Sequence, residues 1–105
     1  MVAWYTTETV AGKEISESLG VAMGSTIRAR NIGKDIVAGL RTLVGGEVPE
    51  YTEMMAHARN QAIERMEQKA TELEADAIVC VRFSTAMIMQ GTAEVMAFGT
   101  AVKFK

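Results

Sequence analysis

The residues of this sequence best suited to hold a metal ion are one cysteine, Cys80, one histidine, His57, and eight methionines. Zinc sites need three or four Cys, His or carboxylate ligands, usually with two of them close in sequence. Cys80 and His57 stand far apart, and no CxxC or HxxxH pair occurs. The sequence therefore disfavours a zinc site within one chain. Met87, Met89 and Met96 could hold Cu(I), because the strand pattern described below directs them to one face, although methionine also fills irregular cores and packing is the favoured interpretation.

Cys80 and His57 each have a simple structural interpretation. Cys80 is expected in the middle of a strand, on its small-residue face, where a buried and unreactive thiol is the common outcome. His57 lies beside the apolar stripe of a predicted helix, four residues after Glu53, which favours an exposed histidine paired with that carboxylate. No GxSxG motif supplies a nucleophile, and no catalytic residue is predicted. Cys80 and His57 remain the candidate metal ligands.

Three of the charged residues on strand segments are candidates for a functional role. Glu17 and Glu94 occupy otherwise apolar faces, which could suit acid–base chemistry, but both lie near strand ends, where exposure at the rim is expected. Arg82 is predicted in mid-strand on the small-residue face, opposite Gly99. A guanidinium there could bind an anion or form an ion pair across a subunit boundary, and the boundary is favoured.

The pair Gly45-Gly46 could form an anion-binding turn. The sequence contains neither GxxxxGK[ST] nor GxGxxG, so the end of a helix explains the pair more simply. Arg82, Gly45 and Gly46 are therefore the candidate ligand-binding residues, and no cofactor is expected.

The elements that would position these residues can be read from hydrophobic periodicity. Residues 15–29 alternate between large apolar and small side chains, which predicts a strand, and Gly20 and Gly24 within it suggest a bulge or a close approach by another backbone. A helix is predicted next, with Asn31 as N-cap and apolar residues at Ile32, Ile36, Val37, Leu40, Leu43 and Val44. Pro49 begins a second helix of about seven turns, whose apolar stripe runs from Tyr51 to Leu73.

From Ala77 onward the period returns to two, and Gln90-Gly91 separates two strands as a hairpin loop would. This register pairs Met89 with Thr92. Counting outward, Phe83 faces Phe98, Thr85 faces Met96 and Val79 faces Val102. The smaller residues Ser84, Ala86, Ala97, Gly99 and Ala101 share the other face.

These elements predict an α+β fold, an antiparallel or mixed β-sheet with two consecutive helices packed on one face, in the order β-β-α-α-β-β. Two helices do not cover both faces of such a sheet, so a homo-oligomer is expected, in which neighbouring subunits approach the small-residue face. A monomer whose small face is solvated is the alternative.

Bulk composition narrows the class of protein. The chain has 105 residues, of which 49% are hydrophobic and 23% charged, as in a single globular domain covering residues 1–105. The net charge of −2 gives no basic footprint for nucleic acid, and no apolar run approaches the ~20 residues that span a bilayer. The N-terminus lacks the features of a signal peptide and one cysteine fits a reducing compartment, so the cytoplasm is expected, with neither nucleic acid nor membrane as partner.

Four segments carry a family resemblance: NIGKDIVAGLRTLVGGEVPEY (residues 31–51), ARNQA (58–62), ADAIV (75–79) and GTAVK (99–103). Together they resemble the YbjQ-like family of small prokaryotic proteins. The resemblance implies a dodecin-subunit-like fold, assembly as a ring that is typically a pentamer, and a heavy-metal-binding label without an established activity. The family usually has L-G-A-D where this chain has Leu73-Glu74-Ala75-Asp76, and Glu in a left-handed turn would cost roughly 1 kcal/mol.

The leading functional interpretation is a non-enzymatic oligomeric binding or scaffold protein. Any ligand, a small molecule or a metal ion, would be held between subunits and lined by small residues and Arg82. An enzyme is the third and least favoured interpretation. The alternative is a heavy-metal-binding protein with a site between subunits.

Overall fold

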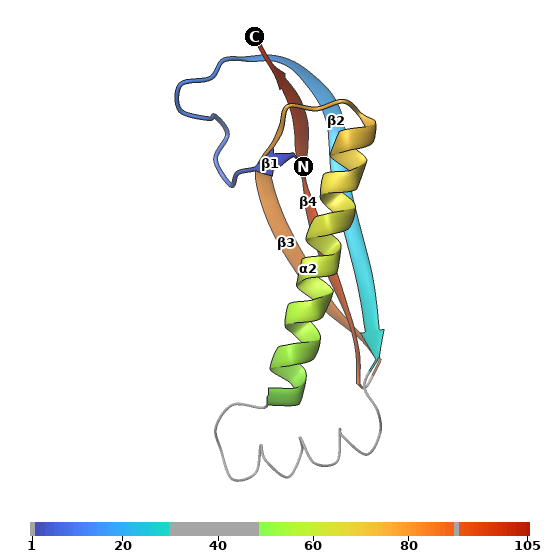
Figure 1. Cartoon of the computed structure of the whole chain (residues 1–105). Coiled ribbons are helices and arrows are strands. Elements are labelled where there is room, and N and C mark those ends of the chain that lie inside the picture. The colour runs from blue at the N-terminus through green and yellow to red at the C-terminus, as the bar shows by residue number, and fades with distance from the viewer. Residues whose placement is uncertain (1, 30–48, 90) are drawn as a thin grey trace.

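The structure is a computed structural model that describes residues 2–29, 49–89 and 91–105. Its elements are β1 (Ala3–Trp4), β2 (Ile15–Ala29), α2 (Pro49–Glu72), β3 (Ala77–Met89) and β4 (Thr92–Phe104). The strands form one sheet in the order β1-β3-β4-β2, in which β1 and β3 are parallel and the other neighbours antiparallel. The fold is therefore α+β with a mixed four-stranded sheet (Figure 1). The predicted helix at residues 31–44 and the Gly45-Gly46 pair lie outside the described residues.

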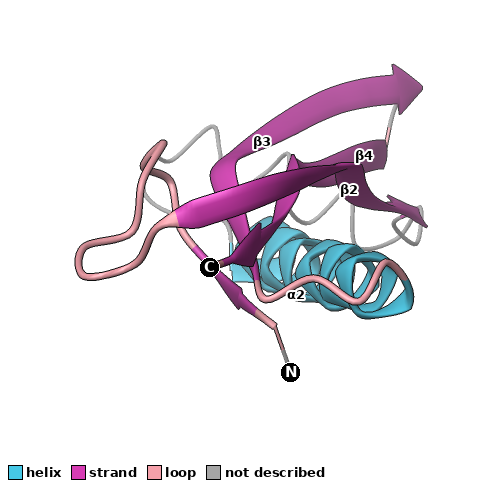
Figure 2. Ribbon diagram, turned by 90° about the horizontal axis from the view of Figure 1, so that it is seen from above, coloured by secondary structure: helices cyan, strands magenta, loops and turns pink. Residues whose placement is uncertain are grey.

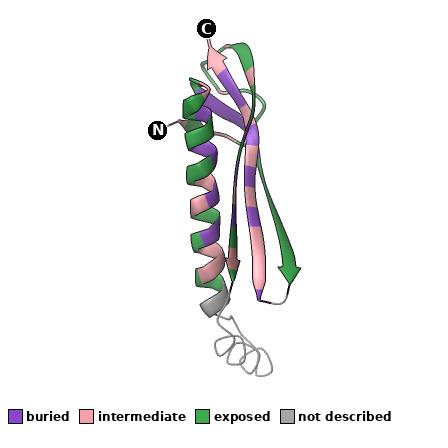
Figure 3. Ribbon diagram, turned by 90° about the vertical axis from the view of Figure 1, so that its right-hand side faces the viewer, coloured by how far each residue is buried: buried purple, intermediate pink, exposed green. Residues whose placement is uncertain are grey.

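Among the described residues, helix α2 covers one face of the sheet and leaves most of the other face open, as Figures 2 and 3 show. Only near the chain termini is this other face covered, where Tyr5 and Val10 pack against Val79 and Val102. Helix α2 lies mainly over β2 and β4. The helix begins at Pro49, as predicted, and its buried stripe follows helical spacing, so the apolar pattern accounts for both its start and its orientation. The buried positions of the stripe are Ala58, Ala62, Met66 and Ala70. In the described part of the chain, no helix has both the length and the apolar character needed to cross a membrane.

The face of the sheet beneath α2 is built from small residues. On β2 the buried positions are Ala22, Gly24 and Thr26, and on β4 the corresponding partners are Gly99, Ala97 and Val95. A Cβ atom on Gly24 would overlap main-chain atoms of Ala62 and Met66, so only glycine allows the helix to lie this close. The predicted close approach at Gly24 is confirmed, and so is the irregularity at Gly20, which has a φ of 115° beside a register shift.

This arrangement corrects the expected use of the two faces. The small-residue face was expected to meet neighbouring subunits, but α2 of the same chain fills it. The face left open carries the large side chains Val21, Met23 and Ile27, which are 58%, 51% and 58% exposed. The reason is geometric: a helix packs closest where side chains are small, so the chain's own helix takes the small face.

The hairpin pairing also differs from the prediction. Met89 pairs with Thr92 as expected, but a register shift between Met87 and Met89 moves Phe83 opposite Ala97, and Thr85 opposite Val95. A second shift between Val79 and Arg82 places Val79 opposite Thr100. Each bulge inserts one residue into β3 and transfers the following side chains to the other face. Phe83 and Phe98 therefore lie on opposite faces of the sheet.

The end of α2 keeps the geometry that a glycine would give. Glu74 has a φ of 61°, its N–H donates to the Thr71 carbonyl at 3.0 Å, and the Ala75 N–H donates to the Ala70 carbonyl at 3.0 Å. These two bonds form a Schellman motif, in which a left-handed residue closes the helix. The departure from L-G-A-D thus adds strain at Glu74 and leaves the turn intact.

Candidate functional site

Arg82 anchors the N-terminal segment to β3. Its Nη1 atom donates to the carbonyl oxygens of Thr6 and Val81, both at 2.8 Å, and its residue pair across the sheet is Phe98. The predicted position opposite Gly99 is wrong, because the bulge between Met87 and Met89 shifts the register by one residue. The guanidinium is already engaged by main-chain oxygens of its own chain.

Cys80 and His57 are not brought into a common metal site with other ligands. Cys80 occupies the bulge, with a φ of 56°, a half-buried side chain, and an N–H that donates to the Thr7 carbonyl at 3.0 Å. His57 is exposed on α2. Across residues 2–29, 49–89 and 91–105, no three His, Cys, Asp or Glu side chains gather in a geometry that could hold a metal ion.

The two strand carboxylates lie where the sequence suggested. Glu17 is exposed near the start of β2, and Glu94 is half-buried near the start of β4. Both lie near strand ends, and Glu17 is exposed as the rim interpretation expects, whereas Glu94 on the inner strand β4 is half-buried. In the described part of the chain, neither joins a group of three His, Cys, Asp or Glu side chains that could hold a metal ion.

A set of hydrogen-bonded polar side chains lies between α2 and the end of β2. Thr26, which is only 4% exposed, donates its hydroxyl to Gln61 Oε1 at 2.6 Å, and Arg28 Nη2 donates to the same oxygen at 3.1 Å. The Arg28 Nε atom is buried without a hydrogen-bond partner. On the same helix face, Arg65 Nη1 donates to the Ser25 carbonyl at 2.6 Å. These bonds fasten α2 to β2 and fix the position of the helix over the sheet.

The methionines are distributed differently from the prediction. Met87 pairs with Ala93 on the α2 side, whereas Met96 pairs with Ser84 and Ser25 on the open side. The expected group of Met87, Met89 and Met96 is therefore not formed.

Met87 instead lines a pocket of about 240 Å³ together with two methionines of α2. Among the described residues, its lining is Met54, Met55, Thr85, Ala86, Met87, Gly91, Thr92 and Ala93. Sequence reasoning missed this site, because it joins segments more than thirty positions apart through a bulge that has no sequence mark.

The second prominent surface is the open face of the sheet, which we call the open apolar face and define by Val21, Met23, Ile27, Met96 and Phe98. Met23 lies opposite Phe98. Met96 precedes Phe98 by two positions on β4 and therefore lies on the same face of the sheet. The three β2 side chains are more than half exposed, while Met96 and Phe98 are half-buried. Five neighbouring apolar side chains on one face are typical of a surface that contacts another molecule.

Comparison with solved structures agrees with this architecture. A crystal structure of a protein of unknown function from Pediococcus pentosaceus, assigned to the DUF74 family, superposes with a TM-score of 0.64. The match covers 99% of this chain and 98% of that one at 16% sequence identity, so it supports the fold alone.

Sequence comparison identifies the family. A UPF0145 protein of Dehalococcoides mccartyi is 62% identical over 91% of this chain and 92% of its own length. A UPF0145 protein of Methanosarcina acetivorans is 57% identical over 93% and 92% of the two lengths. A family model described as "Putative heavy-metal-binding" matches residues 2–105. The chain therefore belongs to this YbjQ family of UPF0145 proteins.

Proposed function

We propose that this chain is a non-enzymatic binding or scaffold protein that works as a homo-oligomeric ring, with its ligand held between subunits. The observation that carries the proposal is the open apolar face. Val21, Met23 and Ile27 each expose more than half of their surface, and burying the exposed part contributes on the order of 1 kcal/mol for each side chain. The partner is expected to be a second copy of the chain, because another copy is always present wherever the protein is made and has an equally apolar surface.

The two edges of the sheet favour a ring over a simple dimer. In the described part of the chain, β2 ends the sheet on one side, and on the other side β1 pairs only with Ala77 and Ile78 of β3. The segment after β1 accepts further hydrogen bonds from Cys80 and Val81, and beyond them β3 is an edge whose residues from Arg82 to Met89 are all exposed. Two different edges on one sheet allow head-to-tail contact, which closes into a ring when the rotation per subunit permits. The pentamer implied by the family resemblance fits this type of contact.

Light scattering at micromolar concentration tests the assembly. The chain mass is 11.4 kDa, and the proposal expects a multiple of it, with five copies for a pentamer. The double variant Met23→Lys and Ile27→Lys places two charges on the open apolar face and should reduce the assembly to the monomer mass. The double variant Asn60→Lys and Gln68→Lys, on the exposed side of α2, serves as the charge-matched control and should assemble normally. A wild-type mass of 11.4 kDa would remove the proposal. Native mass spectrometry of the assembly with cytosolic metabolites then tests for the ligand.

Heavy-metal binding is the second candidate function, because the matching family model carries that description. The described part of a single chain gathers no set of His, Cys, Asp and Glu ligands, so a site of that type would have to combine residues such as Cys80 and His57 from several subunits. The proposal expects stoichiometric zinc or copper in protein purified without chelator. Protein that contains no metal by elemental analysis, and whose melting temperature does not change when metal is added, would contradict it.

A further inference from the structure

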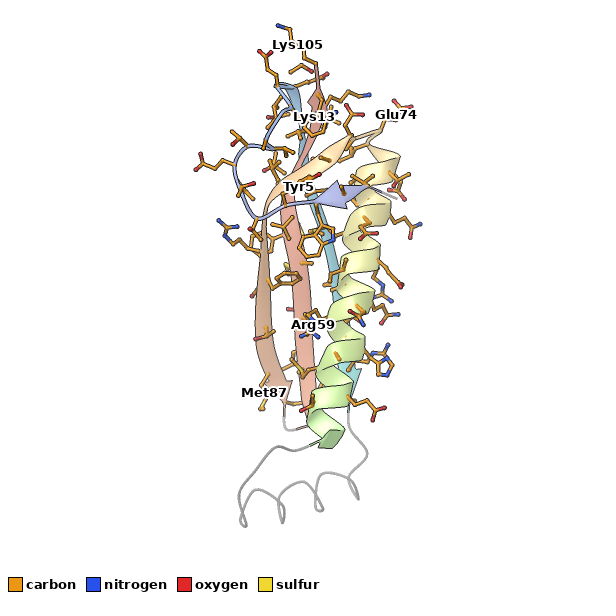
Figure 4. All side chains as sticks on the ribbon, turned by 60° about the vertical axis from the view of Figure 1, so that its left-hand side comes forward. Tyr5, Lys13, Arg59, Glu74, Met87 and Lys105 are labelled. Carbon is orange, nitrogen blue, oxygen red and sulfur yellow. The ribbon has the colours of Figure 1, made fainter. Side chains whose placement is uncertain are left out.

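The pocket between the start of α2 and the β3–β4 hairpin contains three thioether side chains. Met54 and Met55 come from the first turns of α2, and Met87 comes from β3 near the hairpin. Figure 4 shows Met87 at the hairpin end of β3, at the end of the molecule where α2 begins. Three methionines from two separate elements thus line one pocket.

Exposure distinguishes these methionines from the one that fills the core. Met66 is 0% exposed and packs among alanines and valines, as a space-filling methionine does. Met87 is 75% exposed, and Met54 and Met55 are half-buried at the pocket. Core packing therefore explains Met66 and does not explain Met87, most of whose surface is exposed.

The donor atoms of the pocket restrict the class of ion that it suits. Its described lining contains no carboxylate, imidazole or thiol, and its side-chain heteroatoms are three thioether sulfurs and the hydroxyls of Thr85 and Thr92. Thioethers are soft neutral donors that select Cu(I) and related ions over Zn²⁺, Mg²⁺ or Ca²⁺. Because the donors are uncharged and the walls apolar, a monovalent ion has a smaller desolvation cost there than a divalent one.

We propose that this pocket binds a soft monovalent metal ion, Cu(I) or its analogue Ag(I), through the sulfur atoms of Met54, Met55 and Met87. The inference rests on the second proposed function, metal binding, and gives it a particular ion class and a site within one chain. It is independent of the open apolar face, which lies on the other side of the sheet.

Silver titration followed by NMR of ¹³C-methyl-labelled methionine tests the site directly. Ag(I) needs no reductant, and the buffer must be free of chloride. All proteins carry Cys80→Ser, so that the single thiol does not compete for the ion. We expect saturation at one equivalent per chain, with three of the eight methionine methyl signals shifting together: those of Met54, Met55 and Met87. Shifts confined to other methionines, or equal shifts of all exposed ones, would overturn the site.

Leucine variants separate coordination from packing, because leucine keeps the apolar volume and removes the sulfur. Met54→Leu, Met55→Leu and Met87→Leu should each weaken Ag(I) binding by at least about tenfold, since even outer-sphere changes at metal sites cost this much. Met23→Leu, on the open apolar face at 51% exposure, is the matched control and should bind as before. Unchanged affinity in the three pocket variants would overturn the inference.

A parallel zinc titration of the wild-type chain, which keeps the Cys80 thiol, distinguishes this failure from failure of metal binding as a function. Protein that binds Zn²⁺ and does not bind Ag(I) would refute the thioether site and leave metal binding in place. Protein that binds neither ion would refute both.

Discussion

Gly24 of β2 lies directly against the main chain of Ala62 in α2. A Cβ atom at position 24 would overlap the Ala62 carbonyl oxygen and the Met66 amide nitrogen, which are both backbone atoms and cannot move aside without displacing the helix. This contact sets the distance between the helix and the sheet. It also determines which face of the sheet is covered, because the opposite face of β2 presents Met23 and other large side chains.

Gly24→Ala should therefore lower the free energy of unfolding by about 1–3 kcal/mol, the usual cost of overpacking. Urea denaturation at one fixed protein concentration measures the change, since assembly would make stability depend on concentration. Ser25→Ala is the neighbouring control: Ser25 is engaged by Arg65 through its carbonyl oxygen, and that bond survives the substitution. If both variants unfold like the wild type, the close packing of α2 on β2 is refuted.

The sequence predicted the elements better than it predicted their faces. The alternation in residues 15–29 and the stripe after Pro49 gave β2 and α2 correctly, because each pattern repeats over many residues. The face assignment on β3 failed because one extra residue reverses every side chain beyond it. At the bulge, Cys80 has a φ of 56°, which residues other than glycine rarely adopt. Because the residue there is not glycine, nothing in the sequence predicts the bulge.

The same bulges explain why the candidate sites were only partly foreseen. Arg82 was placed opposite Gly99 by simple counting, and the structure places it opposite Phe98 with its guanidinium bound to the Thr6 carbonyl. The methionine pocket depends on Met87 lying on the α2 side of the sheet. That orientation is determined by long-range packing, so it cannot be predicted from the local sequence pattern.

Glu74→Gly should raise the free energy of unfolding by up to about 1 kcal/mol. Glu74 closes α2 with a φ of 61°, a region in which side chains other than glycine are strained. Gln68→Gly is the control of opposite sign, because a glycine inside the exposed part of the helix costs about 1 kcal/mol. Thermal unfolding of both variants measures the difference. A destabilised Glu74→Gly variant would show that the Glu74 side chain contributes more than its backbone strain costs.

The Gln61 network should behave as a coupled unit. Gln61→Met removes the acceptor of both Thr26 and Arg28 and leaves a hydroxyl buried without a partner, which should cost about 1–3 kcal/mol. Adding Thr26→Val in the Gln61→Met background should then cost less than Thr26→Val alone. We expect the double-mutant cycle to give a coupling energy of about 0.5–3 kcal/mol. Strictly additive effects would show that the 2.6 Å hydrogen bond between Thr26 and Gln61 contributes nothing to stability.

The aromatic pair of Trp4 and Phe83 provides a test of the register in β3. Trp4 is the single tryptophan, and its ring lies edge-to-face on Phe83 with centroids 5.9 Å apart and planes at 77°. Phe83→Leu should red-shift the tryptophan emission and lower the free energy of unfolding by at least about 0.5–1.5 kcal/mol, the contribution of such a pair beyond its buried area.

Phe98→Leu is the decisive comparison, because the bulges place Phe98 on the opposite face of the sheet from Phe83. Emission of Trp4, selectively excited, should be unchanged in this variant even if stability or assembly falls. An unbulged hairpin would put both phenylalanines on one face, so that either substitution would alter the surroundings of Trp4. Equal emission shifts in the two variants would therefore refute the register, and with it the placement of Met87 beside α2 on which the soft-metal pocket depends.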